Sequence, residues 1–259
     1  MKKIVLSLAI TAAFGGITSL AHAQEASEWS FAGNAGLVSD YRFRGFTQTN
    51  YKPAFQGGFD LAHASGFYIG NWNSNVEESL YSGASLEMDF YAGYKGTFQD
   101  VGYDVGYYYY AYPGTGANGA THYKNGEIYV GTSYGPISAK AWYATTNYFS
   151  LKNDSTGKDS KGSYYLELNG AYEVAQGVTV LGHVGWQKIK NGTSLLDRDG
   201  FNAKTDNVTD WKIGATKDVS GWLLGLAVVG TNEKDLIATG SPLRDGGKTG
   251  VVASVAKTF

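Results

Sequence analysis

Apolar and polar side chains alternate along most of this chain with a period of two residues. Residues 84–96 show the pattern most clearly, with one apolar face and one mixed face. The apolar face carries Leu86, Met88, Phe90, Ala92 and Tyr94, and the mixed face carries Glu87, Asp89, Tyr91, Gly93 and Lys95. Successive side chains of a β-strand point to opposite faces, whereas a helix would scatter these residues around its axis. The pattern therefore predicts strands.

Twelve segments of the chain follow this pattern. The predicted strands are Trp29–Ser39, Lys52–Ala62, Gly66–Asn73, Ser85–Gly96, Asp100–Ala111, Gly126–Gly135, Ile137–Asn147, Gly162–Ala175, Gly177–Lys188, Val208–Lys217, Trp222–Gly230 and Thr249–Phe259. The alternation is weakest in Gly66–Asn73 and in Trp222–Gly230, where both faces are apolar.

The connections between these segments alternate between short and long. Five short turns begin at His63, Thr97, Gly135, Ala175 and Val219. Six long polar connections cover residues 41–51, 74–84, 112–125, 148–161, 189–207 and 231–248. An even strand number with short periplasmic turns and long extracellular loops is typical of outer-membrane barrels. We therefore predict an all-β fold, a transmembrane antiparallel up-and-down β-barrel of about 12 strands; a soluble β-sandwich or jelly roll is the alternative.

The composition is compatible with a barrel. After the first residues, no apolar run reaches the roughly 18 to 20 residues of a membrane helix, which excludes a helical membrane protein. The absence of cysteine excludes disulfides and thiolate metal sites, and 36 glycines with 20 tyrosines suit packed strands and interfacial aromatics. We expect aromatic girdles from Trp29, Phe31, Trp72, Tyr94, Tyr103, Tyr164, Tyr172, Trp186, Trp211 and Trp222.

Both ends of the sequence fit an exported barrel. A basic start, an apolar stretch and the small-residue pattern that ends at Ala23 predict a signal peptide over residues 1–23, cleaved after Ala23. Residues 24–259 are then the barrel. The last segment alternates up to Phe259, and a Phe at the end of the final strand is the assembly signal of outer-membrane barrels. We therefore predict localisation in the bacterial outer membrane.

Two motifs near the start of the predicted barrel carry a family resemblance. Residues 40–60 read DYRFRGFTQTNYKPAFQGGFD, and residues 66–76 read GFYIGNWNSNV. In these motifs, and over the rest of the predicted barrel, the chain resembles the TorF-type family of outer-membrane porins. The resemblance implies an outer-membrane barrel with a pore role and implies no particular solute. Lys257 departs from the apolar or aromatic residue preferred two places before the final Phe, which weakens the assembly signal and leaves the predicted fold unchanged.

A compact group of charges follows the first predicted strand. If this strand continues its alternation, Asn34, Asp40, Arg42 and Arg44 face the lumen near its outer mouth. The group would form a constriction or contact solutes. The alternative is a set of charge pairs that fill and rigidify the barrel interior.

The same alternation places further charges in the lumen. They are Asp60, Glu87, Asp89, Lys95, Asp104, Glu127, Lys140, Glu167, Glu173, Asp210 and Lys212. Carboxylates outnumber cations here, and an acidic lining favours cations, so we predict a mild cation preference. Lumen aromatics would either stack on solutes or occupy volume in a narrow barrel; they include Tyr91, Tyr108, Tyr110, Trp142 and Tyr165.

No pattern predicts catalysis or a resident metal. His183 faces the lumen, but its local sequence HVGW lacks the serine spacing of outer-membrane phospholipases. The connection after Ile189 contains Asp197, Asp199, Asp206 and Asp210, and these match a calcium loop only at its opening. We therefore expect a solvated outer loop there. No basic stripe indicates nucleic acid.

We predict a passive diffusion channel for small ions or hydrophilic solutes. It should be narrow, because its strands enclose less space than the roughly 16 to 18 strands of general porins. We expect no cofactor, a monomer, and four kinds of partner: outer-membrane lipid with lipopolysaccharide, the barrel assembly machinery, periplasmic chaperones and small solutes. Two alternatives are a non-conducting structural or adhesin-type barrel with a side-chain-filled lumen, and an outer-membrane hydrolase or protease.

Overall fold

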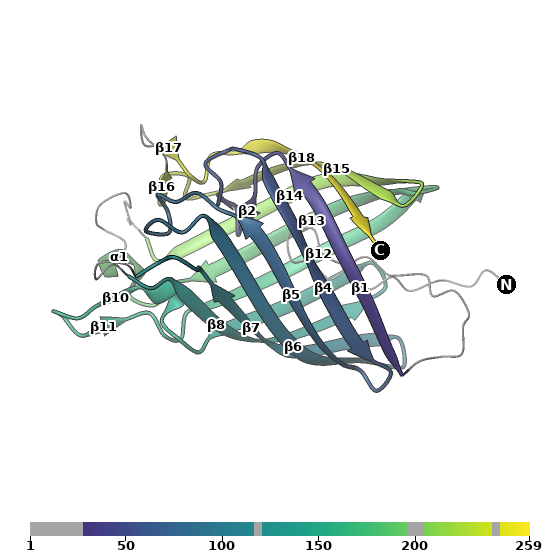
Figure 1. Cartoon of the computed structure of the whole chain (residues 1–259), viewed down its shortest axis with the longest axis horizontal. Helices are drawn as coiled ribbons and strands as arrows, with labels where there is room; N and C mark the ends of the chain where they lie inside the picture. Colours follow the sequence, from purple (N-terminus) through teal and green to yellow (C-terminus); the bar gives the residue numbers. More distant parts are fainter. Residues whose placement is uncertain (1–27, 117–120, 196–204, 240–243) are drawn as a thin grey trace.

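Twelve strands form one closed antiparallel barrel (Figure 1). The computed structural model describes residues 28–116, 121–195, 205–239 and 244–259. The barrel strands are β1 (Trp29–Val38), β4 (Ala54–His63), β5 (Phe67–Asn75), β6 (Leu86–Phe98), β7 (Val101–Ala111), β8 (Lys124–Tyr134), β9 (Ile137–Ala144), β12 (Tyr164–Ala175), β13 (Val178–Lys188), β14 (Asn207–Val219), β15 (Trp222–Thr231) and β18 (Gly250–Thr258). Closure comes from the pairing of β1 with β18, in which Leu37 lies opposite Val255.

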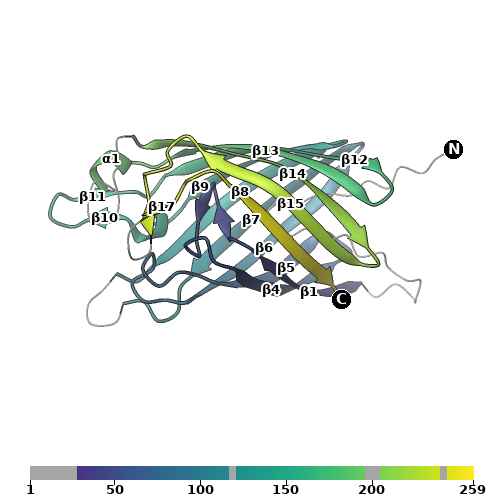
Figure 2. The ribbon, with the colours of Figure 1, turned by 90° about the horizontal axis from the view of Figure 1, so that it is seen from above.

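The predicted barrel is confirmed, and each predicted strand corresponds to one barrel strand within a few residues. Long connections gather at one end of the barrel, and short turns gather at the other, where β1 begins and β18 ends (Figures 1 and 2). The long connections carry small elements that the sequence did not predict: β2 (Arg42–Phe43), β3 (Phe46–Thr47), η2 (Tyr148–Ser150), β10 (Lys152–Asn153), β11 (Lys158–Asp159), α1 (Gly192–Leu195), β16 (Ala238–Thr239) and β17 (Arg244–Asp245).

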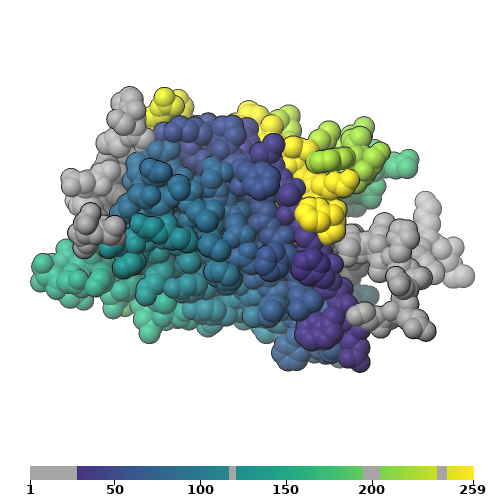
Figure 3. Space-filling model, viewed as in Figure 1, coloured from purple at the N-terminus to yellow at the C-terminus, as the bar shows by residue number. Residues whose placement is uncertain are grey.

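The outer wall is apolar along the strands. Figure 3 shows the wall over β1 and β4 to β6 as a continuous packed surface. Its exposed residues, and those of the other strands, include Phe31, Leu37, Phe55, Phe59, Ile69, Phe90, Val105, Ile128, Val130, Leu166, Leu168, Val184, Ile213, Leu226 and Val251. An apolar exterior around fully paired strands suits lipid, because a closed barrel satisfies every strand hydrogen bond internally. Among the described residues, no helix is long and apolar enough to cross a membrane.

Inside the barrel, tyrosine rings lie over glycines of the neighbouring strand. Tyr91 pairs with Gly70, and a side chain added at Gly70 would meet the Tyr91 ring. Tyr129 of β8 and Gly106 of β7 repeat the arrangement on the next pair of strands. At these positions a glycine and a tyrosine of neighbouring strands are coupled, because the missing side chain makes room for the large ring.

The prediction that Trp72 belongs to the outer aromatic girdle is wrong. Trp72 lines an internal cavity and packs on Tyr41 at a centroid distance of 5.4 Å, so it lies inside the barrel. The alternation of β5 explains the difference, because exposed Phe67 and Ile69 set the outer face and leave position 72 on the inner one. The predicted signal peptide, residues 1–23, lies outside the described residues.

Candidate functional site

A short hairpin inside the barrel occupies its outer half. The first barrel strand ends at Val38, and β2 and β3 then form a separate antiparallel pair before β4 begins. The alternation of the first strand therefore does not continue through Asp40, Arg42 and Arg44, which belong to the inserted hairpin and line an internal cavity. We call residues 40–51 the inner hairpin. Most of its side chains are buried, although it was predicted as a polar connection.

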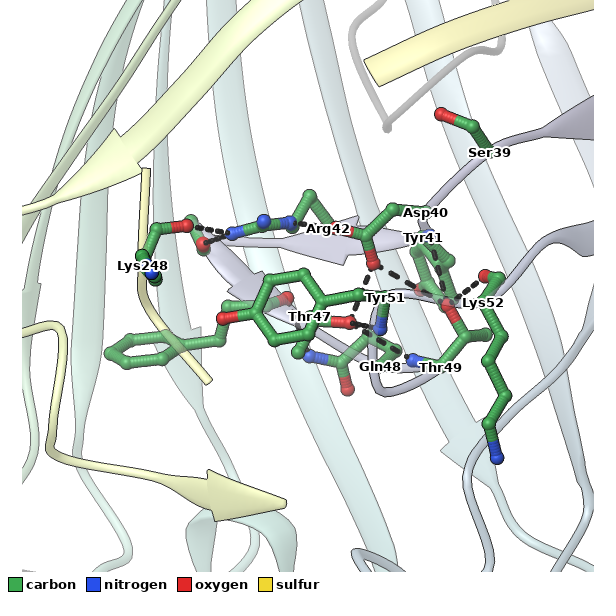
Figure 4. Close-up of polar contacts among 12 residues, drawn as sticks. Ser39, Asp40, Tyr41, Arg42, Thr47, Gln48, Thr49, Tyr51, Lys52 and Lys248 are labelled. Carbon is green, nitrogen blue, oxygen red and sulfur yellow. Dashed lines mark hydrogen bonds and ion pairs between the residues drawn. The ribbon is translucent and has the colours of Figure 1, made fainter. Parts of the chain in front are cut away.

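Asp40 anchors the base of the inner hairpin (Figure 4). Its carboxylate pairs with Arg42 and accepts hydrogen bonds from the hydroxyls of Thr47 and Thr49. Arg42 Nη1 donates in turn to the carbonyl oxygens of Gly45 at 2.9 Å and Lys248 at 3.0 Å. One buried ion pair thus ties both hairpin strands to the connection between β15 and β18.

Arg44, at the tip of the inner hairpin, reaches across the lumen. Nη2 donates to Glu127 Oε2 at 2.8 Å and Nη1 to Glu127 Oε1 at 3.2 Å, a bidentate pair with β8. Nη1 also donates to Gln187 of β13 and to the Tyr148 hydroxyl at 3.2 Å. Burial raises the pKa of Tyr148 to about 12, so its hydroxyl stays protonated at neutral pH. Four segments far apart in sequence therefore meet at one guanidinium.

Gly45 allows the hairpin tip to lie against the barrel wall. Its φ of +85° is a conformation that favours glycine. A Cβ at this position would lie 2.9 Å from Asp210 Cβ and 3.1 Å from the Gly230 carbonyl oxygen. The tip is thus held by conformation and by close approach to β14 and β15.

Two cavities lie on the two sides of the hairpin tip, and Phe43 and Arg44 line both. The outer vestibule has a volume of about 100 Å³ and is mainly apolar. It is lined by Phe43, Arg44, Phe46, Thr47, Gln48, Leu80, Tyr81, Tyr123, Tyr148, Phe149, Leu151, Gln187, Ile189, Val208, Leu236 and Ile237. The inner chamber, of about 130 Å³, holds charges and aromatic rings. It is lined by Asp40, Tyr41, Arg42, Phe43, Arg44, Gly45, Trp72, Asp89, Tyr108, Tyr110, Trp142, Tyr165, Glu167, His183, Asp210, Lys212, Ala227, Val229 and Val252.

A hydrogen-bonded network covers one wall of the inner chamber. Tyr165 Oη donates to Asp210 Oδ2 at 2.9 Å, and His183 Nε2 lies 2.9 Å from Asp210 Oδ1. Trp142 Nε1 donates to Glu167 Oε1 at 2.8 Å. The network fixes large rings and carboxylates together and leaves no nucleophilic serine or cysteine among the residues that line the chamber.

Most predicted lumen carboxylates accept a hydrogen bond from an aromatic side chain. The pairs are Asp60 with Tyr91, Glu87 with Tyr41, Asp89 with Tyr108, Asp104 with Tyr68, Glu127 with Tyr110, Glu167 with Trp142 and Asp210 with Tyr165. The sequence placed the charges and the rings on the same faces but gave no sign of this pairing. Apart from the contact of Tyr41, which lies in the inner hairpin, these contacts join different strands, and the barrel register brings them together.

The other predicted residues lie in different surroundings. Lys140 pairs with Asp104 at 3.3 Å, and Lys95 Nζ lies 5.2 Å from the centroid of the Tyr68 ring. Asn34 is half-buried in β1. Glu173 is exposed beside the turn between β12 and β13, where Oε1 accepts a hydrogen bond from the Gly177 amide at 3.0 Å.

Within the described ranges, no group of three or more His, Asp or Glu side chains is arranged to hold a metal ion. Asp197 and Asp199 of the candidate calcium loop lie outside the described residues. Asp206 pairs with Lys188, and Asp210 faces the inner chamber instead of the loop.

Comparisons with known proteins agree with the barrel. A family model described as "Bacterial protein of unknown function (Gcw_chp)" matches residues 22–259. No curated protein sequence matches the chain. Similar solved structures include "KdgM porin in complex with disordered oligogalacturonate", with a TM-score of 0.52 and 9% identity over 89% of this chain and 98% of that one. The structure of NanC porin gives a TM-score of 0.54 and 8% identity over 89% of this chain and 99% of that one. At such identities the likeness concerns the fold.

Proposed function

Because this chain belongs to the bacterial family described as a protein of unknown function (Gcw_chp), we propose its function from its own lumen: a narrow outer-membrane channel for passive diffusion of small ions or hydrophilic solutes. The observation that carries the proposal is the inner hairpin, which lies inside a closed barrel between two cavities. A hairpin held in this way would narrow the path of a solute through the lumen, and no separate plug domain is needed for this.

The outer-membrane location is supported by the apolar outer wall and by the similarity in fold to KdgM and NanC porins. Signal-peptide cleavage after Ala23, the TorF-type resemblance and the predicted partners belong to the same proposal. Those partners are lipopolysaccharide, the assembly machinery that reads Phe259, periplasmic chaperones and the permeating solutes. The N-terminal mass of protein purified from outer membranes tests the cleavage site directly.

We also propose that the channel prefers cations mildly and that it is not an enzyme. The buried lumen charges support the preference: Asp40, Glu87, Asp89, Asp104, Glu127, Glu167 and Asp210 are buried carboxylates, and the basic groups near them are fewer. An acidic lining raises the local concentration of cations. The pore-lining roles of the predicted residues, from Asn34 to Lys212, are part of this proposal.

Single-channel conductance in a planar bilayer under a salt gradient tests the function. We expect stable current steps of small conductance with a reversal potential on the cation-selective side. Folded protein that inserts and passes no current would contradict the channel. An anion-selective reversal potential would contradict the cation preference alone and would assign the dominant field to Arg42 and Arg44.

A second function is a non-conducting barrel with a filled lumen. One observation favours it: Arg44 joins the inner hairpin to β8, β13 and η2 by hydrogen bonds, so the hairpin tip spans the interior. The two proposals differ in a single result, because only the channel passes current in the wild-type protein.

A further inference from the structure

Asp89 lines the inner chamber, and one of its carboxylate oxygens has no hydrogen-bond partner. The side chain lines the chamber, and the residue is only 1% exposed. Tyr108 donates a hydrogen bond to Oδ2 at 3.0 Å, whereas Oδ1 has no hydrogen-bond partner. A buried carboxylate oxygen without a partner costs free energy, about 1–3 kcal/mol or more for a charged group. A positive charge placed beside this carboxylate would offset that cost.

The neighbouring carboxylate repeats the arrangement. Glu87 lies two residues away on the same face of β6 and is also 1% exposed. Tyr41 Oη donates to Glu87 Oε1 at 3.1 Å, and Oε2 has no partner. Burial, followed by the charge of Glu87, raises the pKa of Tyr41, so this hydroxyl remains a donor at neutral pH.

Asp89 differs from the other carboxylates of the inner chamber. Asp40 pairs with Arg42, and Asp210 and Glu167 lie 2.9 Å and 3.7 Å from ring nitrogens of His183. No basic side chain of the described residues forms an ion pair with Asp89 or Glu87. Lys212 belongs to β14, which lies on the other side of the barrel from β6 and faces Glu167 and Asp210.

Aromatic rings line the same chamber as Asp89. Tyr41 and Trp72 pack edge to face at 5.4 Å, and Tyr108 lies 4.7 Å from Tyr110; all four rings line the chamber. The protein's own cations already use ring faces in this lumen, since Arg44 lies 4.2 Å from the centroid of Tyr165. Faces of Trp and Tyr attract cations through the ring quadrupole.

The combination selects one class of cation. Ca²⁺ takes six to eight oxygen ligands, and the described residues offer no cluster that could supply them. A carboxylate bordered by aromatic rings instead suits an alkylated ammonium such as a quaternary ammonium, which carries no or few N–H groups for water and is recognised by aromatic faces. The chamber volume of about 130 Å³ limits the size, since a cavity of about 150 Å³ holds benzene.

We propose that the inner chamber binds a small organic ammonium ion, with Asp89 as its counter-ion and Tyr41 and Trp72 as part of its aromatic wall. The proposal names a solute class for the proposed channel and in that sense rests on the channel function. The binding itself does not require permeation, so the two can fail separately.

Saturation-transfer NMR with tetramethylammonium tests the site on the refolded protein in detergent micelles. The uncharged isostere tert-butanol is the control ligand. We expect saturable binding of tetramethylammonium and none of tert-butanol. Asp89→Asn should weaken binding at least about tenfold, the equivalent of roughly 1.4 kcal/mol. Asp154→Asn, which removes the same charge from an exposed loop, should leave binding unchanged.

Several results would overturn the site. Equal binding of the two ligands would show that the chamber is a non-specific apolar cavity. No binding of tetramethylammonium would indicate that Asp89 and Glu87 share a proton and do not bind a cation. Unchanged affinity in Asp89→Asn would show that Asp89 is not the counter-ion. If that variant does not fold, Trp72→Leu provides the test, because loss of the aromatic wall should also weaken tetramethylammonium binding severalfold and unchanged affinity would overturn the site.

Current measurements on the same preparation separate the two proposals. Binding without current in the wild-type protein would contradict the channel and keep the ammonium site. Current without binding, and without block of K⁺ current by tetramethylammonium, would keep the channel and exclude the site.

Discussion

The outer vestibule and the inner chamber are divided by the same two side chains, Phe43 and Arg44, and differ in both origin and chemistry. The vestibule is built mainly from connections, with Leu80, Phe149 and Leu236 supplied by three different loops. The chamber is built from strand residues around the hairpin. A permeating solute would meet an apolar surface first and a charged one afterwards.

The side chains around the two cavities are stabilised in different ways. Loop residues that line the vestibule form a packed cluster of their own, in which Leu236 is 2% exposed and Val208 is equally buried. The chamber keeps its charges buried because each finds a tyrosine, a tryptophan or an opposite charge. The hairpin tip is thus supported by hydrophobic packing on one side and by electrostatics on the other.

Removal of the Arg44 side chain should have the largest effect on this division. In Arg44→Ala, the fully buried Glu127 carboxylate loses its ion pair. Removal of one partner from a buried pair destabilises proteins by about 3–5 kcal/mol. We expect that loss in denaturant unfolding and, in protein that folds, a severalfold larger single-channel conductance as the two cavities join.

Lys52→Ala is the matched control, because the Lys52–Glu77 pair is exposed. Its loss should change the free energy of unfolding by less than about 1 kcal/mol and leave the conductance unchanged. Wild-type conductance in folded Arg44→Ala would show that the Arg44 side chain does not limit passage.

Gly45→Ala should displace the same hairpin tip by a smaller amount. A side chain at a φ of +85° costs about 1–2 kcal/mol, and the new Cβ would also press on Asp210 Cβ, 2.9 Å away. Gly157→Ala separates the two contributions, because Gly157 has a φ of +66° and no atom within 4 Å of the added Cβ.

The Gly45 variant should alter the conductance, whereas the Gly157 variant should lower stability only. Equal conductance in both variants would mean that close approach of the hairpin tip to β14 does not define the constriction.

The sequence predicted the barrel because a strand shows its two faces as a two-residue alternation, and residues such as Phe59 and Ile213 mark the lipid side directly. It could not predict the inner hairpin. A pair of two-residue strands is too short to show a period, and the hydrogen bonds of Arg44 reach Glu127, Tyr148 and Gln187, each more than eighty residues away. The long connections were predicted as polar loops, and the apolar residues among them, such as Leu151 and Leu236, gave the one available signal of the vestibule.

Lys212→Met should have the smallest effect of these substitutions, and it tests the electrostatic character of the inner chamber. Lys212 is the lysine among the residues that line the chamber, and it faces Glu167 and Asp210. Loss of its positive charge leaves those carboxylates less compensated, so the permeability ratio of cations to anions should rise. The change should be about two- to fivefold, the effect of roughly one unit charge a few ångströms away in a water-like dielectric. The shift in reversal potential under a salt gradient measures it.

Lys158→Met removes the same charge from the exposed β10–β11 hairpin and should leave the reversal potential unchanged. An unchanged reversal potential in Lys212→Met would mean that ions do not pass the chamber wall formed by β12 and β14. The charged cavity would then be a packing feature of the lumen, and selectivity would be set at the vestibule, where Arg44 is the charged residue among the lining side chains.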